Sequence, residues 1–261
     1  MDPTALLEIK GLTKAFGGLS AVRDLDLDVK KGEIGSLIGP NGAGKTTVFN
    51  LITGALAPTA GRITLEGMSV EGKRPHQITR AGIARTFQNI RLFGAMTALE
   101  NVMVGFDAHS RTGVLDALLR TGRARREEAA GAQRARELLE LVGIAHSAEQ
   151  ECRNLSYGDQ RRLEIARALA TEPKLLLLDE PTAGMNPVEK QRIVHLVREI
   201  RDWGATILLI EHDMRVVMGI SERVTVLDFG QKIAEGSPEQ VQREPKVIEA
   251  YLGRGALQDG S

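Results

Sequence analysis

A glycine-rich segment near the start of the chain constrains its fold more than any other feature. Residues 39–46 read Gly-Pro-Asn-Gly-Ala-Gly-Lys-Thr and match the pattern G-x-x-x-x-G-K-[ST]. The segment follows a short apolar run, Ile34–Ile38, that predicts a strand, and it precedes a helix predicted over Thr46–Thr53. This order of strand, loop and helix is typical of a phosphate-binding loop (P-loop) in an α/β protein. The alternative is a glycine-rich turn that happens to precede a helix, and the spacing and context favour the P-loop.

The residue types in this loop suit a nucleotide. Glycines let backbone N–H groups turn inward around an anion, and the following helix adds the positive end of its dipole. Lys45 would reach the β- and γ-phosphates, and the Thr46 hydroxyl would ligate Mg²⁺. We therefore expect ATP and Mg²⁺ as ligands. The expected nucleotide-binding residues are Gly39, Pro40, Asn41, Gly42, Ala43, Gly44, Lys45, Thr46 and Thr47.

An acidic pair supplies candidates for metal binding and catalysis. The apolar run Leu175–Leu178 predicts a buried strand, and Asp179 and Glu180 follow it directly. Ligands of parallel sheets bind at the carboxyl ends of strands, so this pair would lie beside the P-loop. Asp179 would hold Mg²⁺, directly or through water, and Glu180 would act on the attacking water as its base or orienter. A charged pair that ends a strand before a turn is common, and the P-loop upstream is what favours catalysis here.

The chain as a whole predicts a three-layer α/β core with a small antiparallel N-terminal sheet and an inserted helical subdomain at about residues 92–160. Strands and helices alternate after residue 156, which indicates a mostly parallel sheet covered on both faces. Residues 24–29 alternate Asp with Leu or Val, as in an antiparallel edge strand with one solvated face. The other predicted elements are strands Leu6–Leu12, Arg62–Leu65, Thr206–Ile210 and Val224–Asp228, and helices Thr112–Leu119, Arg123–Val142, Tyr157–Ala170 and Pro187–Trp203.

Composition narrows the classes of function. Lys and Arg total 34, as do Asp and Glu, so the chain lacks the basic excess usual for nucleic-acid-binding proteins, and we expect no nucleic-acid partner. With Cys152 as its one cysteine, the chain has no intrachain disulfide and no cysteine-based metal site. No apolar run approaches the ~20 residues that span a bilayer, and the N-terminus does not read as a signal peptide. We expect a cytoplasmic protein whose membrane role would come through a partner.

Further segments resemble motifs of the ATP-binding cassette (ABC) family, in the family's order along nearly the whole chain. Leu155-Ser-Tyr-Gly-Asp-Gln160 resembles the signature motif, and Thr86-Phe-Gln88 resembles the glutamine loop. Glu211-His-Asp213 resembles the segment of the switch histidine, and Ala183-Gly-Met-Asn186 lies where the D-loop belongs. Phe16 occupies the place of the aromatic residue that stacks on adenine. The expected ABC ATPase domain spans residues 5–253, with a loose tail at 254–261.

The resemblance implies a head-to-tail dimer that holds two ATP molecules at its interface. It implies that Ser156 and Gly158 contact the γ-phosphate held by the partner subunit, and Ser156 also suits the N-cap of the next helix. It further implies that His212 contacts the γ-phosphate and that Gln88 touches Mg²⁺ or water and the membrane partner. Phe16 is a candidate for adenine stacking, with a place in the core as the alternative.

Three residues depart from the family's common motifs. Tyr157 replaces a glycine and Asp159 a glutamine in the signature motif, and Asn186 replaces the usual aspartate of the D-loop. A tyrosine has fewer allowed backbone angles than glycine. How these residues affect the coupling between the two ATP sites stays open at this point.

Within the family, the chain resembles the larger ATPase of branched-chain amino acid importers. The segments that carry this resemblance are Leu12–Gly18, Ala84–Phe93, Leu155–Gly158, Met185–Pro187, Val247–Gly253 and a helical insertion around Arg111–Glu128. Such a subunit would pair with a second ABC ATPase and with two membrane permeases on the inner face of the cell membrane, fed by an extracytoplasmic solute-binding protein. Substrate choice belongs to those other subunits.

Four other functions remain as alternatives. The ATPase of a urea or short-amide importer and that of a lipopolysaccharide exporter have closely related sequences. A non-transport cassette that acts on DNA or ribosomes usually carries a long coiled coil or two cassettes, and this chain has one P-loop and no long heptad run. A regulatory subunit without turnover conflicts with the intact Asp179, Glu180 and His212.

Overall fold

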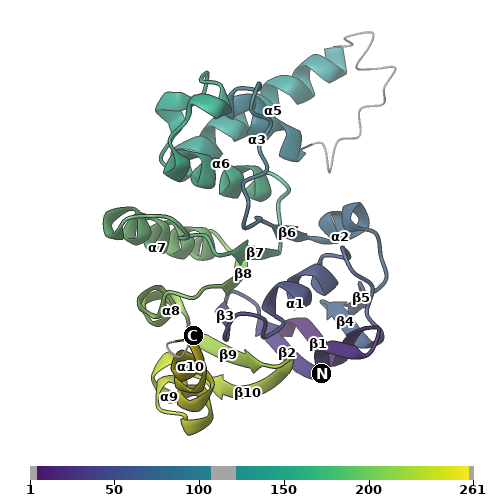
Figure 1. The fold of residues 1–261 in the computed structure, drawn as a ribbon. Helices are drawn as coiled ribbons and strands as arrows, with labels where there is room; N and C mark the ends of the chain where they lie inside the picture. Colours follow the sequence, from purple (N-terminus) through teal and green to yellow (C-terminus); the bar gives the residue numbers. More distant parts are fainter. Residues whose placement is uncertain (1–4, 107–121, 259–261) are drawn as a thin grey trace.

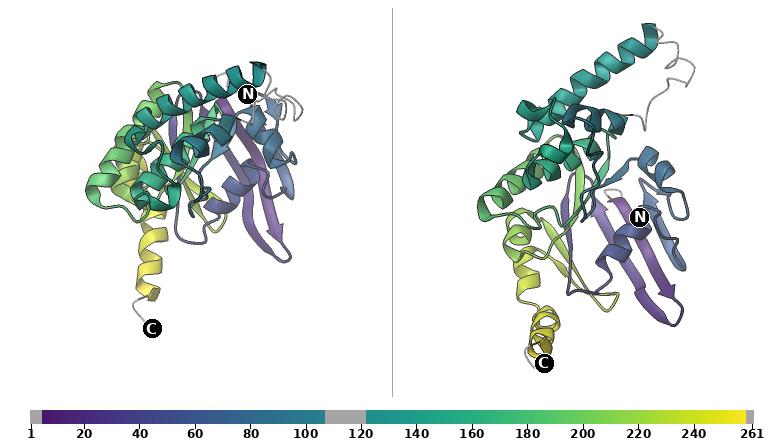
Figure 2. Two further views of the ribbon diagram at one scale, coloured as in Figure 1. Left: turned by 90° about the horizontal axis from the view of Figure 1, so that it is seen from above. Right: turned by 45° about the horizontal axis from the view of Figure 1, so that its top comes forward.

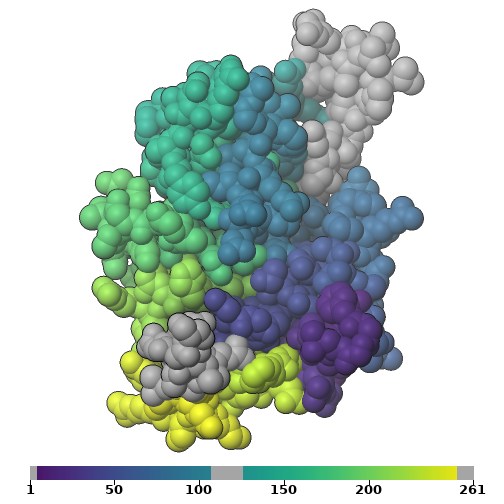
Figure 3. All heavy atoms as spheres, viewed as in Figure 1, coloured from purple at the N-terminus to yellow at the C-terminus, as the bar shows by residue number. Residues whose placement is uncertain are grey.

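The computed structural model describes the backbone of residues 5–106 and 122–258 (Figure 1). These residues form an α/β core between an antiparallel sheet and a helical subdomain, as the sequence predicts. The predicted helix Thr112–Leu119 lies outside the described residues. Figure 3 shows the helical subdomain and the C-terminal helices at opposite ends of the molecule.

The central sheet has six strands in the order β10-β9-β3-β8-β7-β6. Its parallel strands are β3 (Ile34–Ile38), β6 (Ile83–Arg85), β7 (Leu175–Asp179), β8 (Thr206–Ile210) and β9 (Arg223–Asp228), and β10 (Gln231–Gly236) pairs antiparallel with β9. Every residue of β3, β7 and β8 is buried, as expected for strands covered on both faces. These three strands therefore place their carboxyl ends side by side.

Successive leucines of β7 serve two different hydrophobic cores, because side chains alternate between the faces of a strand. Leu175 and Leu177 pack with α1 (Lys45–Ile52) and the antiparallel sheet. Leu176 and Leu178 pack on the other face, which α6 (Tyr157–Leu169), α7 (Pro187–Asp202) and α8 (Met214–Ile220) cover. The sequence predicts α6 and α7 to within a residue, and it does not predict α8.

The antiparallel sheet has the strand order β2-β1-β4-β5. It consists of β1 (Ala5–Phe16), β2 (Leu19–Lys30), β4 (Ala60–Leu65) and β5 (Met68–Ser69). In the edge strand β2, Leu25, Leu27 and Val29 are buried, while Asp26 is exposed and Asp28 half-buried, so the predicted one-sided edge strand is confirmed. β1 and β2 are both longer than predicted, because their ends extend beyond the alternating segment.

The helical subdomain joins the core through the segment that follows β6. It contains α3 (Ala98–Phe106), α5 (Gly122–Leu141) and α6, with short 3₁₀ helices η1 (Ala145–Ser147) and η2 (Cys152–Asn154). The sequence predicts an end of α5 at Gly143, and the helix ends at Leu141, two residues earlier. Gly143 has φ 75°, a conformation common after a helix. Helix α2 (Pro75–Ala81), between β5 and β6, and helix α3 are not predicted from the sequence.

Two C-terminal helices, α9 (Pro238–Gln242) and α10 (Pro245–Gln258), complete the chain (Figure 2). Val241 and Val247 from these helices pack on Ile38 and β9. α10 continues to Gln258, five residues into the segment that the sequence predicts as the tail. Ala, Leu and Gln at 256–258 are good helix formers, which suits this extension. No helix among the described residues is long and apolar enough to cross a membrane.

Candidate active site

The P-loop connects β3 to α1 and depends on two crowded glycines. Gly39 has φ 149°, and a Cβ added to it would lie 2.1 Å from the carbonyl oxygen of Leu227. Gly44 has φ 103°, and its Cβ would lie 2.5 Å from the carbonyl oxygen of Ala21. The loop is thus pressed against the backbone of β9 and β2, where a side chain does not fit. This close approach keeps the loop in the curved shape that a phosphate group requires.

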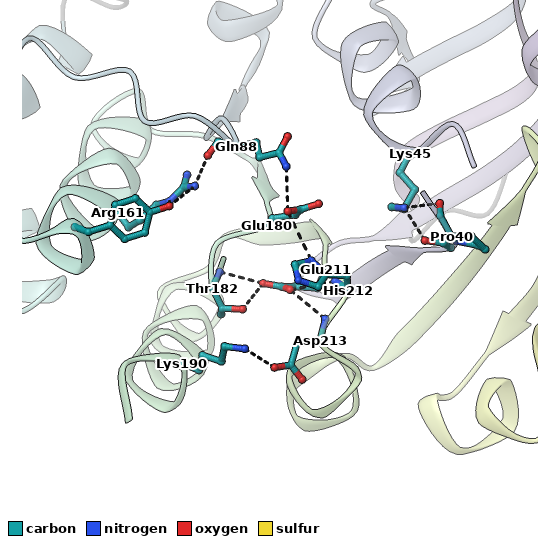
Figure 4. Close-up of polar contacts among 12 residues, drawn as sticks. Pro40, Lys45, Gln88, Arg161, Glu180, Thr182, Lys190, Glu211, His212 and Asp213 are labelled. Atoms are coloured by element: carbon teal, nitrogen blue, oxygen red, sulfur yellow. Dashed lines mark hydrogen bonds and ion pairs between the residues drawn. The ribbon is translucent and has the colours of Figure 1, made fainter. Parts of the chain in front are cut away.

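The start of α1 is suited to an anion. The helix has no side-chain N-cap and no acidic residue in its first turn, so its first N–H groups can serve a phosphate. The buried Lys45 points into the loop, where its Nζ donates to the carbonyl oxygens of Gly39 at 2.6 Å and Pro40 at 3.0 Å (Figure 4). Thr46 is exposed at the same end of the helix. These residues fit the triphosphate of a nucleotide.

Asp179 ends β7 with a buried carboxylate that pairs with Arg85. An Nη of Arg85 donates to Oδ2 of Asp179 at 2.7 Å, and its other Nη donates to Asn50 on α1 at 2.6 Å. The guanidinium carbon lies 5.4 Å and 5.3 Å from the ring centroids of Phe49 and Phe87. Arg85 therefore fixes Asp179 relative to the P-loop helix. Sequence reasoning missed this residue, although it directly precedes the glutamine loop.

Glu180, Gln88 and His212 converge at the carboxyl ends of neighbouring strands (Figure 4). Nε2 of Gln88 donates to Oε2 of Glu180 at 3.2 Å, and Nδ1 of His212 lies 3.6 Å from the same oxygen. Glu180 has φ 49°, which is uncommon for a residue other than glycine and often marks a functional position. The structure thus brings three predicted site residues together around one carboxylate oxygen. Their catalytic roles remain predictions.

A buried carboxylate next to His212 also shapes this region. Glu211 is 1% exposed, and its Oε1 accepts hydrogen bonds from the backbone N–H of Thr182 at 3.0 Å and from the Thr182 hydroxyl at 2.6 Å. It therefore ties the histidine segment to the residue that directly precedes the D-loop. A hydrogen bond from Lys190 to Asp213, 2.6 Å long, lowers the pKa of Asp213 and adds a second connection to α7. The sequence signal for Glu211 was its place directly after the buried strand β8.

The signature helix begins as predicted. The Ser156 hydroxyl accepts a hydrogen bond from the backbone N–H of Asp159 at 3.1 Å and lies 2.9 Å from its carboxylate, so the predicted N-cap is confirmed. Tyr157 is helical and has no unusual φ. A Cβ added to Gly184 in the D-loop would lie 3.3 Å from the Tyr157 ring. The tyrosine therefore joins the signature motif to the D-loop without backbone strain.

The departure at Asn186 also has a local reason. Asn186 is the N-cap of α7, and its Oδ1 accepts the backbone N–H groups of Val188 at 2.9 Å and Glu189 at 3.0 Å. Glu189 returns a bond to the Asn186 N–H, which completes a capping box. An asparagine thus meets the structural need at this position as well as an aspartate would.

Phe16 lies at the end of the β1–β2 hairpin. Its side chain is 49% exposed, so it does not belong to the core, which was the alternative interpretation. The Lys14 ammonium lies 5.0 Å from its ring centroid. An exposed ring is available for stacking, and stacking on adenine remains a prediction.

The donor set fits Mg²⁺ bound together with a nucleotide. Thr46, Asp179 and Gln88 offer a hydroxyl, a carboxylate and an amide oxygen, the hard oxygen ligands that Mg²⁺ prefers. Among the described residues, no three His, Cys, Asp or Glu side chains form a metal-binding group. In the usual Mg²⁺ site of nucleotide enzymes, one or two protein ligands act with phosphate oxygens.

The P-loop forms a glycine-lined cradle at the N-terminus of α1, and two carboxylates follow at the carboxyl end of β7 in the same sheet. This combination defines a P-loop nucleotide hydrolase. Comparison with known families identifies which family of P-loop hydrolases this is. The family model "ABC transporter" matches residues 22–183, and the model "Branched-chain amino acid ATP-binding cassette transporter" matches residues 231–256. The chain belongs to the ABC transporter family and is an ATP-hydrolysing ATP-binding cassette.

Similar proteins cover nearly the whole chain. The "High-affinity branched-chain amino acid transport ATP-binding protein LivG" of Salmonella typhimurium is 49% identical over 249 residues, which are 95% of this chain and 98% of that protein. The ADP conformation of MJ1267, an ATP-binding cassette of an ABC transporter, superposes with a TM-score of 0.84 at 34% identity, over 95% and 99% of the two chains. The dimeric structure of the bacterial cassette MJ0796 gives a TM-score of 0.76 at 28% identity, over 89% and 98%.

Proposed function

We propose that this chain powers an importer of branched-chain amino acids and that it hydrolyses ATP at the interface of a head-to-tail dimer. The likeness to LivG along the full chain and the match of residues 231–256 to a branched-chain amino acid cassette model support this substrate class. The arrangement around Glu180 carries the proposal for the site, because Gln88 and His212 both approach one oxygen of that carboxylate.

Each residue has a distinct task in the proposed reaction. Lys45 and the N–H groups of the P-loop bind the β- and γ-phosphates and stabilise the charge that develops on them. Glu180 orients the attacking water and accepts its proton, while His212 contacts the γ-phosphate. Thr46, Asp179 and Gln88 would hold Mg²⁺, which neutralises phosphate charge when it is bound. Phe16 stacks on the adenine ring.

The second half of each site comes from another subunit. The related bacterial cassette MJ0796 has a dimeric structure, which supports a dimer here. Ser156 and Gly158 at the start of α6 would contact the γ-phosphate held by the partner, which is a second ABC ATPase of the same or a similar sequence. ATP binding would close the dimer, and hydrolysis would reopen it. Two permeases would convert this motion into transport, with the cassette on the cytoplasmic face of the membrane and a solute-binding protein outside.

The first test is the Glu180→Gln variant, tagged and isolated with ATP from its own host in mild detergent. We expect ATP binding to persist while turnover falls by about 10²–10⁴-fold, because the general base is lost. Mass spectrometry should recover two permeases, a second cassette ATPase and a binding protein that binds branched-chain amino acids. Near-normal turnover would contradict the role of Glu180. Recovery of ribosomes or nucleic-acid proteins without a membrane subunit would contradict transport, and a binding protein for urea or short amides would contradict the substrate class.

A further inference from the structure

Helix α6 buries an ion pair that the proposed reaction does not use. The side chains of Arg161 and Glu164 are 3% and 2% exposed, and their closest N–O distance is 3.3 Å. Buried charges carry a large desolvation cost, so a buried pair contributes little to stability by itself. A reason for burying these two charges must therefore come from their contacts with other residues.

Both side chains bind the backbone of the glutamine loop. The N–H of Phe87 donates to Oε1 of Glu164 at 3.2 Å, and an Nη of Arg161 donates to the carbonyl oxygen of Phe87 at 2.6 Å. The other Nη of Arg161 donates to the carbonyl oxygen of Gln88, as Figure 4 shows. The loop at this point belongs to no helix or strand, so its polar groups need such partners. Three backbone groups of two consecutive residues are thus held by one turn of α6.

Burial shapes the electrostatics of the pair. Burial raises the pKa of the Glu164 carboxyl, while hydrogen bonds from the backbone of Phe87 and Arg91 and the charge of Arg161 oppose the rise. The planar guanidinium of Arg161 also reaches the Tyr157 hydroxyl at 3.0 Å, and it can serve several acceptors at fixed angles. A single point charge such as an ammonium would not replace it.

The held loop leads directly to the catalytic carboxylate. The Gln88 side chain donates to Glu180, and its own backbone carbonyl accepts from Arg161. The same helix begins at Ser156, the residue proposed to meet the partner's nucleotide. The buried pair therefore links the Gln88 segment, which contacts Glu180, to the helix that begins at Ser156.

We propose that Arg161 and Glu164 are positioning residues that fix Gln88 to helix α6, so that Gln88 approaches Glu180 only when α6 is in place. This inference rests on the proposed function, because it takes Glu180 as the base. The pair does not touch the P-loop, so it governs turnover and not the intrinsic affinity for ATP.

The test is the double variant Arg161→Met/Glu164→Met, which removes the side-chain contacts to Phe87 and Gln88 together with both charges of the pair. We expect the dissociation constant for ATP to stay within about twofold, and kcat to fall by about 10–100-fold as the site loses its geometry. Hydrogen exchange at the Phe87 amide should accelerate, because Glu164 is its acceptor. Arg134→Gln is the matched control, since Arg134 makes an exposed ion pair with Glu172 in the same subdomain and should change none of these quantities.

Single variants refine the result if the double variant fails to fold. Glu164→Gln keeps an acceptor for Phe87 and should preserve its protection, whereas Arg161→Lys cannot bind both carbonyl groups and should lower kcat. Wild-type kcat in the double variant, or in Arg161→Lys, overturns the inference. Equal loss of ATP affinity and kcat also overturns it. These outcomes differ from failure of the proposed function, in which Glu180→Gln itself retains near-normal turnover.

Discussion

At the scale of single residues, Gly39 and Gly42 of the P-loop differ in the space around them. Both have positive φ, but a Cβ on Gly39 would lie 2.1 Å from Leu227, whereas a Cβ on Gly42 would meet nothing within 4 Å. Gly42→Ala should therefore cost about 1–2 kcal/mol, the penalty of a left-handed conformation. Gly39→Ala should cost clearly more and abolish ATP binding, because the loop must move away from β9. Urea unfolding and nucleotide titration of the two variants provide the comparison, and equal effects would contradict the crowding argument.

Cys152 gives a prediction about pH. Burial raises the pKa of its thiol to about 11, while Asn101 donates a hydrogen bond to the sulfur. The thiolate fraction at pH 8 should be roughly 240-fold below that of an exposed cysteine with pKa near 8.5. Iodoacetamide should therefore leave the folded protein unlabelled and modify it after unfolding. A labelling rate equal in the two states would exclude a buried thiol.

The sign of the linkage also follows from this raised pKa. A thiol whose folded pKa lies above its unfolded value adds stability that is complete below about pH 8.5 and lost as the pH rises toward 11. Cys152→Ala lacks this titration. The stability advantage of the wild type over that variant should shrink across this range, as measured by unfolding at several pH values.

The site residues differ in how far the sequence could reveal them. Lys45 and Asp179 belong to local patterns, so the order of strand, loop and acidic pair was enough to find them. Arg85, Arg161 and Glu211 escaped prediction because each binds a segment distant in sequence. Arg85 pairs with a carboxylate 94 residues away, and Arg161 binds the Phe87 carbonyl 74 residues away. A buried charge on an otherwise apolar face becomes visible only when the fold supplies its partner.

At the scale of elements, strands β3 and β8 carry a clear local sequence signal, whereas the short helices do not. The sequence predicts both strands to the residue, because each is a fully buried apolar run with clear borders. Helices α3 and α8, of nine and seven residues, lack a long periodic pattern. Short helices depend on packing for most of their stability, so their sequences alone carry little signal.

Helix α7 offers an element-scale prediction at its N-cap. Asn186→Ala removes the acceptor of two backbone N–H groups and should lower the free energy of unfolding by about 1 kcal/mol. Asn186→Asp keeps the acceptor and places a negative charge at the helix N-terminus, so its stability should equal or slightly exceed the wild type. Urea unfolding of both variants measures the difference. Indistinguishable stabilities for the alanine and aspartate variants would contradict the capping role.

At the scale of the whole molecule, Arg223 joins the two sheets. From β9 it binds Asp28 on β2 at 2.9 Å, the buried Glu33 at 2.8 Å and Glu235 on β10 at 2.8 Å. Arg223→Met would leave Glu33 buried without its partner and should cost about 3 kcal/mol or more. Arg201→Met is the control, because that exposed pair with Glu222 should contribute under about 1 kcal/mol. A smaller loss for Arg223→Met than for the control would show that the sheets are held together by apolar packing alone.

The arrangement of the proposed composite site leads to the last prediction. Ser156 begins α6 in the helical subdomain, and Lys45 lies in the α/β core. Each proposed ATP site therefore combines the Lys45 of one subunit with the Ser156 of the other. Ser156→Arg should bind ATP normally yet fail to support its partner's site, and Lys45→Ala should fail to bind ATP while offering an intact signature helix.

Each variant alone should lose nearly all ATPase activity, because neither homodimer contains a complete site. A mixture of the two should regain activity, since a mixed dimer contains one P-loop with Lys45 opposite one intact Ser156. Titrating one variant into the other should give a rate that rises to a maximum near equal amounts, as expected for the population of a mixed dimer. A mixture no more active than its parts would contradict a head-to-tail homodimer of this chain. Full activity of Ser156→Arg alone would place the whole site within one subunit.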